Sequence, residues 1–257
     1  MKNILKIMLM MITIFTIAGS AVYAAEIPVS DQDQLITSSD WTEISNLQDE
    51  MKKEEPDATI DYDKALKVYV DCNLIKLQTA DTKKLTSALE SANYVWVIPF
   101  KMEKTYGMFT VAKGLPLREE AKSVLTKAEQ EEVKNHAGKW MITETAEHTV
   151  EPYYDILLEK REALSDCTRV VLVGSQPGMR QPVALGMDDE TARIWISLGY
   201  QYPVMKKIPE TQNVESGVYS FESVADISDT YIEDSEVSTG AGVQSRSSMK
   251  YVAGIGI

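Results

Sequence analysis

Residues Tyr94–Phe100 have the sequence YVWVIPF, seven residues without a charged side chain. β-Branched and aromatic residues dominate this run, and such residues favour a β-strand. A strand with one face in water alternates apolar and polar residues, but here both alternating sets are apolar. Val170–Val173 (VVLV) is apolar on both sides in the same way. We therefore expect the central strands of one sheet to be covered on both faces.

Other strands and helices are predicted around these two runs. The expected strands share apolar or alternating patterns and lie between turn residues: Ala65–Asp71, Tyr94–Phe100, Met108–Ala112, Trp140–Thr143, Arg169–Val173, Val183–Met187 and Ala192–Leu198. Helices are expected after Asp81, Gly114, Thr126 and Pro152, where apolar residues follow at helical spacing. The sequence thus predicts one α+β domain at residues 61–205, with a mixed, largely antiparallel sheet of about seven strands.

Two finer features are expected of this domain. The last strand alternates Ile194 and Ile196 with polar or exposed neighbours, which is typical of an edge or half-exposed strand. The order strand, helix, strand, strand occurs twice, with Lys67 and Lys139 at the start of the two units. Two β-α-β-β units are therefore possible, either through a duplication or because a common unit occurs twice by chance.

The N-terminus has the layout of a secretory signal peptide. Two lysines precede the apolar run Ile7–Ile17, and a stretch of small residues leads to Ala24 and Ala25. We expect residues 1–24 to be removed by cleavage after Ala24. An uncleaved anchor is the alternative, but the apolar run is short for a bilayer that needs ~20 residues. The mature chain is accordingly expected to be secreted or at the cell surface.

Both ends of the mature chain are acidic. Residues 25–60 form a leader with one expected helix, in which Ile44, Leu47 and Met51 share a face. Residues 206–257 are rich in Ser, Asp, Glu and Gly and are expected to form a flexible tail or stalk. The last residues become abruptly apolar, as a membrane anchor begins, but they are too few to span a bilayer. The C-terminus is thus either a truncated anchor or a disordered end.

Charge and composition exclude several classes of partner. The formal net charge is −13, and removal of two lysines with the signal peptide takes it to −15. Nucleic-acid binding depends on Lys and Arg, so an acidic chain is a poor candidate for it. Cys72 and Cys167 can form a disulfide after export, or they can remain buried thiols. With two histidines, His136 and His148, the sequence predicts no metal site and no cofactor.

Catalytic and binding candidates are weak. No GxSxG or phosphate-binding glycine motif occurs, so any hydrolase would have to use carboxylates, with Asp71 and Glu144 at strand ends as the first acids to test. The loop 176–182 (QPGMRQP) places Met179 and Arg180 at a turn between two prolines, and both residue types are enriched in recognition surfaces.

The expected function is therefore that of an exported bacterial protein of the cell envelope or its surroundings, acting as a non-enzymatic binding or surface module. Its partner is expected to be an unknown protein or surface ligand, with no membrane span in the mature chain. A secreted carboxylate-based hydrolase, and an inhibitor that presents the loop 176–182, are the alternatives. The sequence contains no resemblance that decides among them.

Overall fold

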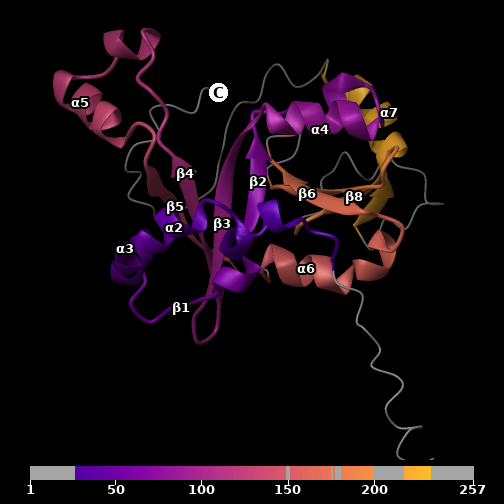
Figure 1. Ribbon diagram of the computed structural model, residues 1–257, viewed down its shortest axis with the longest axis horizontal. Coiled ribbons are helices and arrows are strands. Elements are labelled where there is room, and N and C mark those ends of the chain that lie inside the picture. The colour runs from indigo at the N-terminus through magenta and orange to yellow at the C-terminus, as the bar shows by residue number, and fades with distance from the viewer. Residues whose placement is uncertain (1–26, 149–150, 175, 177–180, 200–216, 233–257) are drawn as a thin grey trace, which may run out of the picture.

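The computed structural model describes residues 27–148, 151–174, 176, 181–199 and 217–232 (Figure 1). The strands are β1 Thr59–Ile60, β2 Leu66–Val70, β3 Asn93–Lys101, β4 Tyr106–Lys113, β5 Trp140–His148, β6 Arg169–Val173, β7 Val183–Met187, β8 Ala192–Ser197 and β9 Val218–Ser220. The α-helices are α2 Trp41–Ile44, α3 Gln48–Glu54, α4 Thr82–Glu90, α5 Lys127–His136, α6 Tyr153–Glu159 and α7 Phe221–Ile232. Short 3-10 helices are η1 Asp31–Asp33, η2 Leu35–Thr37, η3 Ser45–Leu47, η4 Tyr62–Lys64, η5 Ile75–Leu77, η6 Glu120–Ser123 and η7 Arg161–Leu164.

All nine described strands form one mixed sheet, which confirms the predicted α+β fold. The strand order is β5-β4-β3-β2-β6-β7-β8-β9, and β1 pairs with the end of β3. Every neighbouring pair is antiparallel except β2 and β6, which are parallel. Two four-stranded meanders, β2–β5 and β6–β9, therefore run outward in opposite directions from a central parallel pair.

Two helices, α4 and α6, cover opposite faces of the sheet (Figure 1). Helix α4 lies between β2 and β3, which are neighbours, whereas α6 carries the chain from β5 at one edge back to β6 at the centre. The order β-α-β-β thus occurs twice along the chain, but the strands pair differently in the two units. The two halves of the sheet that correspond to each other are the two meanders, β2–β5 and β6–β9, and not the two β-α-β-β units.

The central strands are buried on both faces, as YVWVIPF and VVLV predict. On one face, an α4-side cluster includes Leu85, Leu89, Val171, Val173, Leu185, Trp195, Tyr219, Phe221 and Val224. On the same face, an N-terminal cluster includes Leu35, Ile44, Met51, Trp96, Ile98, Phe100, Phe109 and Val111. On the opposite face, an α6-side cluster includes Val68, Val97, Tyr153, Ile156, Leu157, Val170, Leu172, Ala184 and Ile196. Full burial of each large side chain contributes about 1.5–3 kcal/mol.

The folded body begins earlier than residue 61, because the predicted leader packs onto the sheet. Leu35, Ile44 and Met51 are fully buried, and the ring centroid of Trp41 lies 5.2 Å from that of Tyr62. The expected single helix is divided into α2, η3 and α3. The leader is therefore one wall of the N-terminal cluster.

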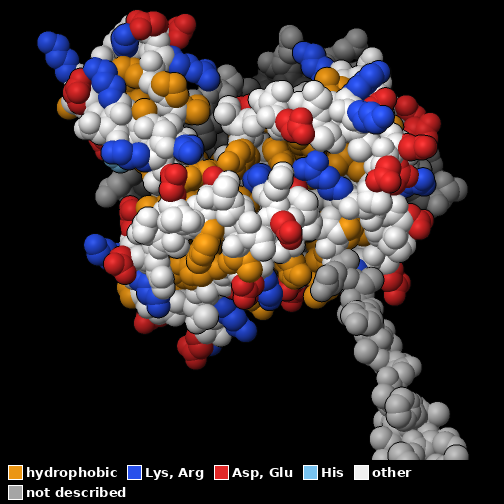
Figure 2. Space-filling model, viewed as in Figure 1, with side chains coloured by type: hydrophobic (Ala, Val, Ile, Leu, Met, Phe, Trp, Pro, Cys, Tyr) orange, Lys and Arg blue, Asp and Glu red, His pale blue; other side chains and the backbone are white. Residues whose placement is uncertain are grey.

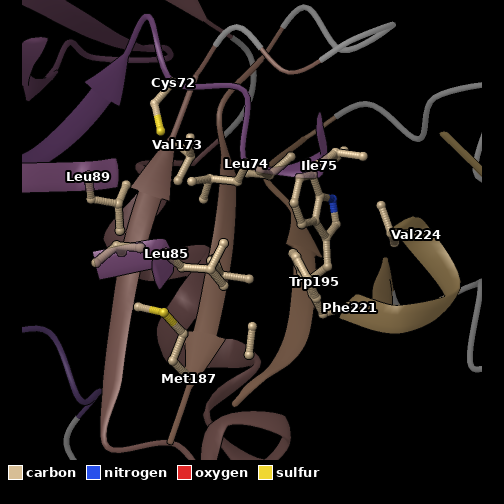
Figure 3. Close-up of a cluster of buried hydrophobic side chains, with 14 of the residues drawn as sticks. Cys72, Leu74, Ile75, Leu85, Leu89, Val173, Met187, Trp195, Phe221 and Val224 are labelled. Carbon is tan, nitrogen blue, oxygen red and sulfur yellow. The ribbon is translucent and has the colours of Figure 1, made fainter. Parts of the chain in front are cut away.

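The body also extends beyond residue 205. Strand β9 pairs with β8, so the strand at Ala192–Ser197 is internal to the sheet and the prediction of an edge strand is wrong. The half-exposed alternative is wrong as well, because Trp195 and Ser197 are buried. Phe221 of α7 packs against Trp195 with ring centroids 6.2 Å apart, and Figure 3 shows Ile75 and Val224 beside them. Among the described residues, no helix has the length and apolar character that a bilayer span requires.

The predicted helix starts at Asp81 and Thr126 agree with the observed caps, whereas the helix expected after Gly114 is only the short 3-10 helix η6. The Asp81 carboxylate accepts a hydrogen bond from the Lys84 N–H at the start of α4. Thr126 and Glu129 form the expected capping box at the start of α5. These local signals depend on residues three positions apart, which is why the sequence alone identifies them.

Cys72 and Cys167 are buried free thiols, so the structure contains no disulfide between them. Cys72 belongs to the α4-side cluster (Figure 3) and Cys167 to the α6-side cluster, on opposite faces of the sheet. Burial raises the pKa of both thiols. Of the two arrangements that the sequence allows, the structure has the unpaired one.

We therefore predict that neither thiol of the folded protein reacts with a thiol reagent at neutral pH, and that both react once the protein is unfolded. Burial hinders access and the raised pKa lowers the thiolate fraction. Thiol titration with and without denaturant measures this. Fewer than two reactive thiols in the unfolded, unreduced protein would contradict it.

Candidate functional site

The two meanders are joined by a seam that residues 27–35 fill. Strands β2 and β6 pair only through Val68–Leu172 and Tyr69–Val173. Beyond these pairs the N-terminal segment bridges both strands, with Val29 opposite Val170 and Gln34 opposite Leu66. The Val170 N–H donates to the Pro28 carbonyl at 2.7 Å, and the Leu35 N–H donates to the Ala65 carbonyl at 3.2 Å. The segment therefore completes the sheet where the two meanders part.

Asp33 lies at the centre of this seam with 2% of its surface exposed. Its carboxylate accepts hydrogen bonds from the Tyr69 hydroxyl at 2.8 Å, the Ser30 hydroxyl at 2.6 Å and the Arg169 Nη2 at 3.1 Å. The Lys67 Nζ is 3.7 Å from Oδ1 of the same carboxylate. A buried charge is tolerated when it is paired and hydrogen-bonded, and Asp33 meets both conditions.

Lys67 projects from β2 into a group of aromatic rings. Its Nζ is 4.6 Å from the ring centroid of Tyr94, 5.2 Å from that of Trp96 and 5.8 Å from that of Tyr69. Ring faces attract cations at these distances. Burial nevertheless lowers the pKa of Lys67, because desolvation outweighs the attraction of the Asp33 and Asp40 carboxylates.

A second carboxylate, Asp40, holds the same rings from the leader side. It accepts hydrogen bonds from the Tyr94 hydroxyl at 2.8 Å and from the Trp96 indole N–H at 3.0 Å. Burial is the largest cause that raises the pKa of Tyr94, and the Asp40 carboxylate adds to it. Burial likewise raises the pKa of Tyr69, followed by the influence of Asp33. Both phenols are therefore hydrogen-bond donors at neutral pH.

We call the group of Asp33, Asp40, Lys67, Tyr69, Tyr94, Trp96 and Arg169 the Asp33 cluster. Two carboxylates balance one ammonium and one guanidinium, and the groups contact one another across the leader, β2, β3 and β6. Such a closed, neutral arrangement holds elements together and leaves little charge for a ligand. The Asp33 cluster therefore stabilises the packing of the leader on β2, β3 and β6.

The residues singled out from the sequence do not come together. Asp71 follows β2, is exposed, adopts a left-handed conformation with φ of 58°, and accepts a hydrogen bond from Asn93 at 3.1 Å. Glu144 lies in the middle of β5, three strands from β2 in the sheet. His136 ends α5 and His148 ends β5. Among the described residues, Asp33 is the one acid that is buried, and no group of His, Cys, Asp and Glu could hold a metal ion.

The loop 176–182, expected from the sequence to be a binding candidate, is described only at its ends. Met179 and Arg180 lie outside the described residues. Gln176 is buried and fixes the start of the loop: its amide donates to the carbonyls of Cys72 at 2.6 Å and Gly174 at 2.9 Å. The acidic turn that follows β7 is internally bonded, because the Asp188 carboxylate accepts from the Thr191 and Glu190 N–H groups. These backbone bonds are the main cause that lowers the pKa of Asp188.

The most exposed feature is a lobe of residues 114–139 between β4 and β5, which contains η6 and α5 and projects from the sheet (Figure 1). None of its residues is buried, and Val124 is 80% exposed. Figure 2 shows hydrophobic side chains gathered on it among basic and acidic ones. Its five Lys and Arg balance its five Glu, whereas the whole chain has a net charge of −13.

The stem of the lobe is narrow. Lys113 and Trp140 face each other as the last pair of β4 and β5, and the Gly114 N–H donates to the Lys139 carbonyl at 2.9 Å. A Cβ on Gly114 would lie 2.1 Å from the His136 carbonyl oxygen, so only glycine fits this approach. The lobe is therefore attached to the sheet at one closed hairpin end.

Comparison with known proteins adds no relative: no family model, no curated protein and no solved structure matches the chain. Sequence reasoning missed the Asp33 cluster because its two acids lie in the segment that we assigned to the leader. A signal was present, since Lys67 interrupts an otherwise apolar strand and needs a partner there.

We predict that Asp33→Ala lowers the free energy of unfolding by about 3–5 kcal/mol, because it leaves Lys67 and Arg169 without their buried counter-charge. Chemical denaturation monitored by tryptophan fluorescence measures the change. The matched control is Asp31→Ala, an exposed acid on the same 3-10 helix, for which we expect a change within about 0.5 kcal/mol. Equal effects of the two substitutions would contradict the role of the cluster.

Proposed function

We propose that this protein is exported by a bacterium and acts in the cell envelope or its surroundings as a non-enzymatic binding module whose lobe contacts the partner. The single observation that carries the binding role is the lobe, which projects from a well-packed sheet without one buried side chain of its own. A segment that adds nothing to the core yet displays apolar side chains is typical of an interaction surface.

The N-terminal sequence supports export. Residues 1–24 lie outside the described residues, so their role as a signal peptide rests on the sequence pattern. Ile27, the third residue after the expected cleavage point, is buried in the α6-side cluster. Cleavage after Ala24 would therefore keep this buried residue and the segment that follows it in the mature chain.

The charge distribution supports a binding role over a carboxylate-based hydrolase. A glycosidase-like pair needs two carboxyl groups on either side of a substrate, at most ~9.5 Å apart. Asp71 and Glu144 lie on strands that are three positions apart, and the Asp33 carboxylate already has four partners. The lobe, by contrast, is electrically neutral, so it does not add to the repulsion that the acidic body exerts on acidic partners.

Replacement of residues 114–139 by an Asn-Gly turn separates binding from folding, because Lys113 and Trp140 already face each other across the hairpin. We expect the free energy of unfolding to change by about 2 kcal/mol, since shortening the loop from 26 residues to two is nearly four halvings and each halving changes the free energy of loop closure by ~0.6 kcal/mol. Binding of the purified chain to isolated cell envelopes of the producing bacterium should be lost. The matched point variant is Val124→Ser, which should weaken binding without changing stability.

Two results would count against this proposal. Undiminished envelope binding by the lobe-replaced chain would remove the lobe from the binding surface. Unfolding of that chain would mean that the lobe belongs to the fold, and the Val124→Ser variant then decides whether its apolar surface also binds.

Export has its own test. We predict that the protein recovered from outside the cytoplasm begins at Ala25, because Ala24 and Val22 satisfy the small-residue requirement of the cleavage site. N-terminal sequencing or intact mass of the exported chain measures this. A full-length chain that starts at Met1 in the membrane fraction would favour the uncleaved anchor instead.

A further inference from the structure

The seam between the two meanders is a receptor for a short peptide segment, and in the structure that segment is the protein's own N-terminus. Strands β2 and β6 share two register pairs, and the remaining length of the seam is bridged by residues 27–35. We propose that the seam also accepts residues 27–35 of a second copy of this chain, so that copies join by exchange of their N-terminal segments.

Recognition in the seam is specific and lies within nine residues. Ile27 belongs to the α6-side cluster and Leu35 to the N-terminal cluster, so the segment has an apolar anchor at each end. Between the anchors, the Asp33 carboxylate meets Lys67 and Arg169, which both come from the walls of the seam. Backbone hydrogen bonds to Val170 and Ala65 set the register. A segment from another copy can make each of these contacts unchanged.

The connection to the rest of the chain can serve as a hinge. Ile36, Thr37 and Ser39 are exposed, and they separate the buried Leu35 from Asp40, which is held by Tyr94 and Trp96. The bonds of this stretch are local: the Thr37 and Ser38 hydroxyls donate to carbonyls of Asp31 and Leu35, and the Ser38 hydroxyl and carbonyl accept from the Asp40 and Trp41 N–H groups. A change of backbone angles at residues 38–39, after η2 and before α2, therefore redirects the segment at the cost of the two bonds to Ser38.

The segment also has a free end in the exported form. This step rests on the proposed function, since cleavage after Ala24 leaves two residues before Ile27. A terminal segment can leave one seam and enter another without threading a loop through it. Because the contacts are the same within one chain and between chains, exchange depends on protein concentration and on hinge strain rather than on new affinity. The net charge of −15 opposes close approach, so exchange should increase with salt.

The experiment uses chains that begin at Ala25 and carry Cys72→Ala and Cys167→Ala, so that its outcome is independent of export and of the lobe. The donor chain carries Gln34→Cys and the acceptor chain carries Leu66→Cys, at positions that face each other in the structure. A single chain that carries both Gln34→Cys and Leu66→Cys is the positive control, because its disulfide should form within the chain. If that disulfide does not form, Val29→Cys in the donor and Val170→Cys in the acceptor are used instead.

Donor and acceptor are refolded together at high protein concentration, oxidised and separated on a non-reducing gel. We expect a disulfide-linked heterodimer. Asp33→Ala in either chain alone should leave the yield nearly unchanged, because a reciprocal exchange only moves the weakened segment from one seam to the other. The matched control donor carries Asp31→Cys in place of Gln34→Cys, at an exposed position of the same segment, and should lower the yield by about tenfold or more, because Gln34 and not Asp31 faces Leu66. Equal yields from the two donors would mean that the cysteines meet at random.

A readout without cysteines accompanies this assay. Light scattering of the unmodified chain from Ala25, refolded at increasing concentration, should show a dimer fraction that rises with concentration. A monomer at every concentration, or a double-cysteine chain that closes internally while the mixture gives no heterodimer, overturns the exchange. Either result leaves the binding role of the lobe untouched, because the lobe lies at the far end of β4 and β5.

Discussion

The fold depends on one buried carboxylate, Asp33, held between Lys67 of β2 and Arg169 of β6. The two meanders have only two register pairs in common, so backbone pairing alone leaves most of their junction open. Residues 27–35 occupy that junction, and Asp33 forms ion pairs with Lys67 of β2 and Arg169 of β6 on its two sides. Because these charges are removed from water, each depends on the others to offset its desolvation. The α4-side and N-terminal clusters meet at this point, since Tyr94 packs against both.

The carboxylates at this junction stabilise the fold. The buried acid is bonded on both oxygens, and Asp40 is engaged by Tyr94 and Trp96. The lobe, attached through a closed hairpin end, contributes no buried side chain to the core. In the function that we propose, binding and stability are carried by different parts of the chain, which is the arrangement expected when a rigid scaffold displays a surface loop.

Much of the fold could be predicted because its signals are local. The runs at Tyr94–Phe100 and Val170–Val173 are strands covered on both faces, and Thr126 with Glu129 caps a helix, since these patterns involve residues only a few positions apart. The folded body is nevertheless longer at both ends than predicted. In the leader, short 3-10 and α turns break the helical period, and β9 has three residues, too few for a strand pattern. Such segments become ordered only by packing on a surface that is built elsewhere.

By itself the sequence determined the α+β class, the apolar character of both faces of the central strands, the helix caps at Asp81 and Thr126 and the expectation of an exported, acidic chain. It also placed a lysine in the middle of an apolar strand, which required a partner without naming it. Only the tertiary structure decided that this partner is Asp33, that the two cysteines lie on opposite faces, and that Asp71 and Glu144 stay apart. The reason is physical: local patterns depend on near neighbours, whereas a charge cluster depends on which distant residues the folded chain removes from water together.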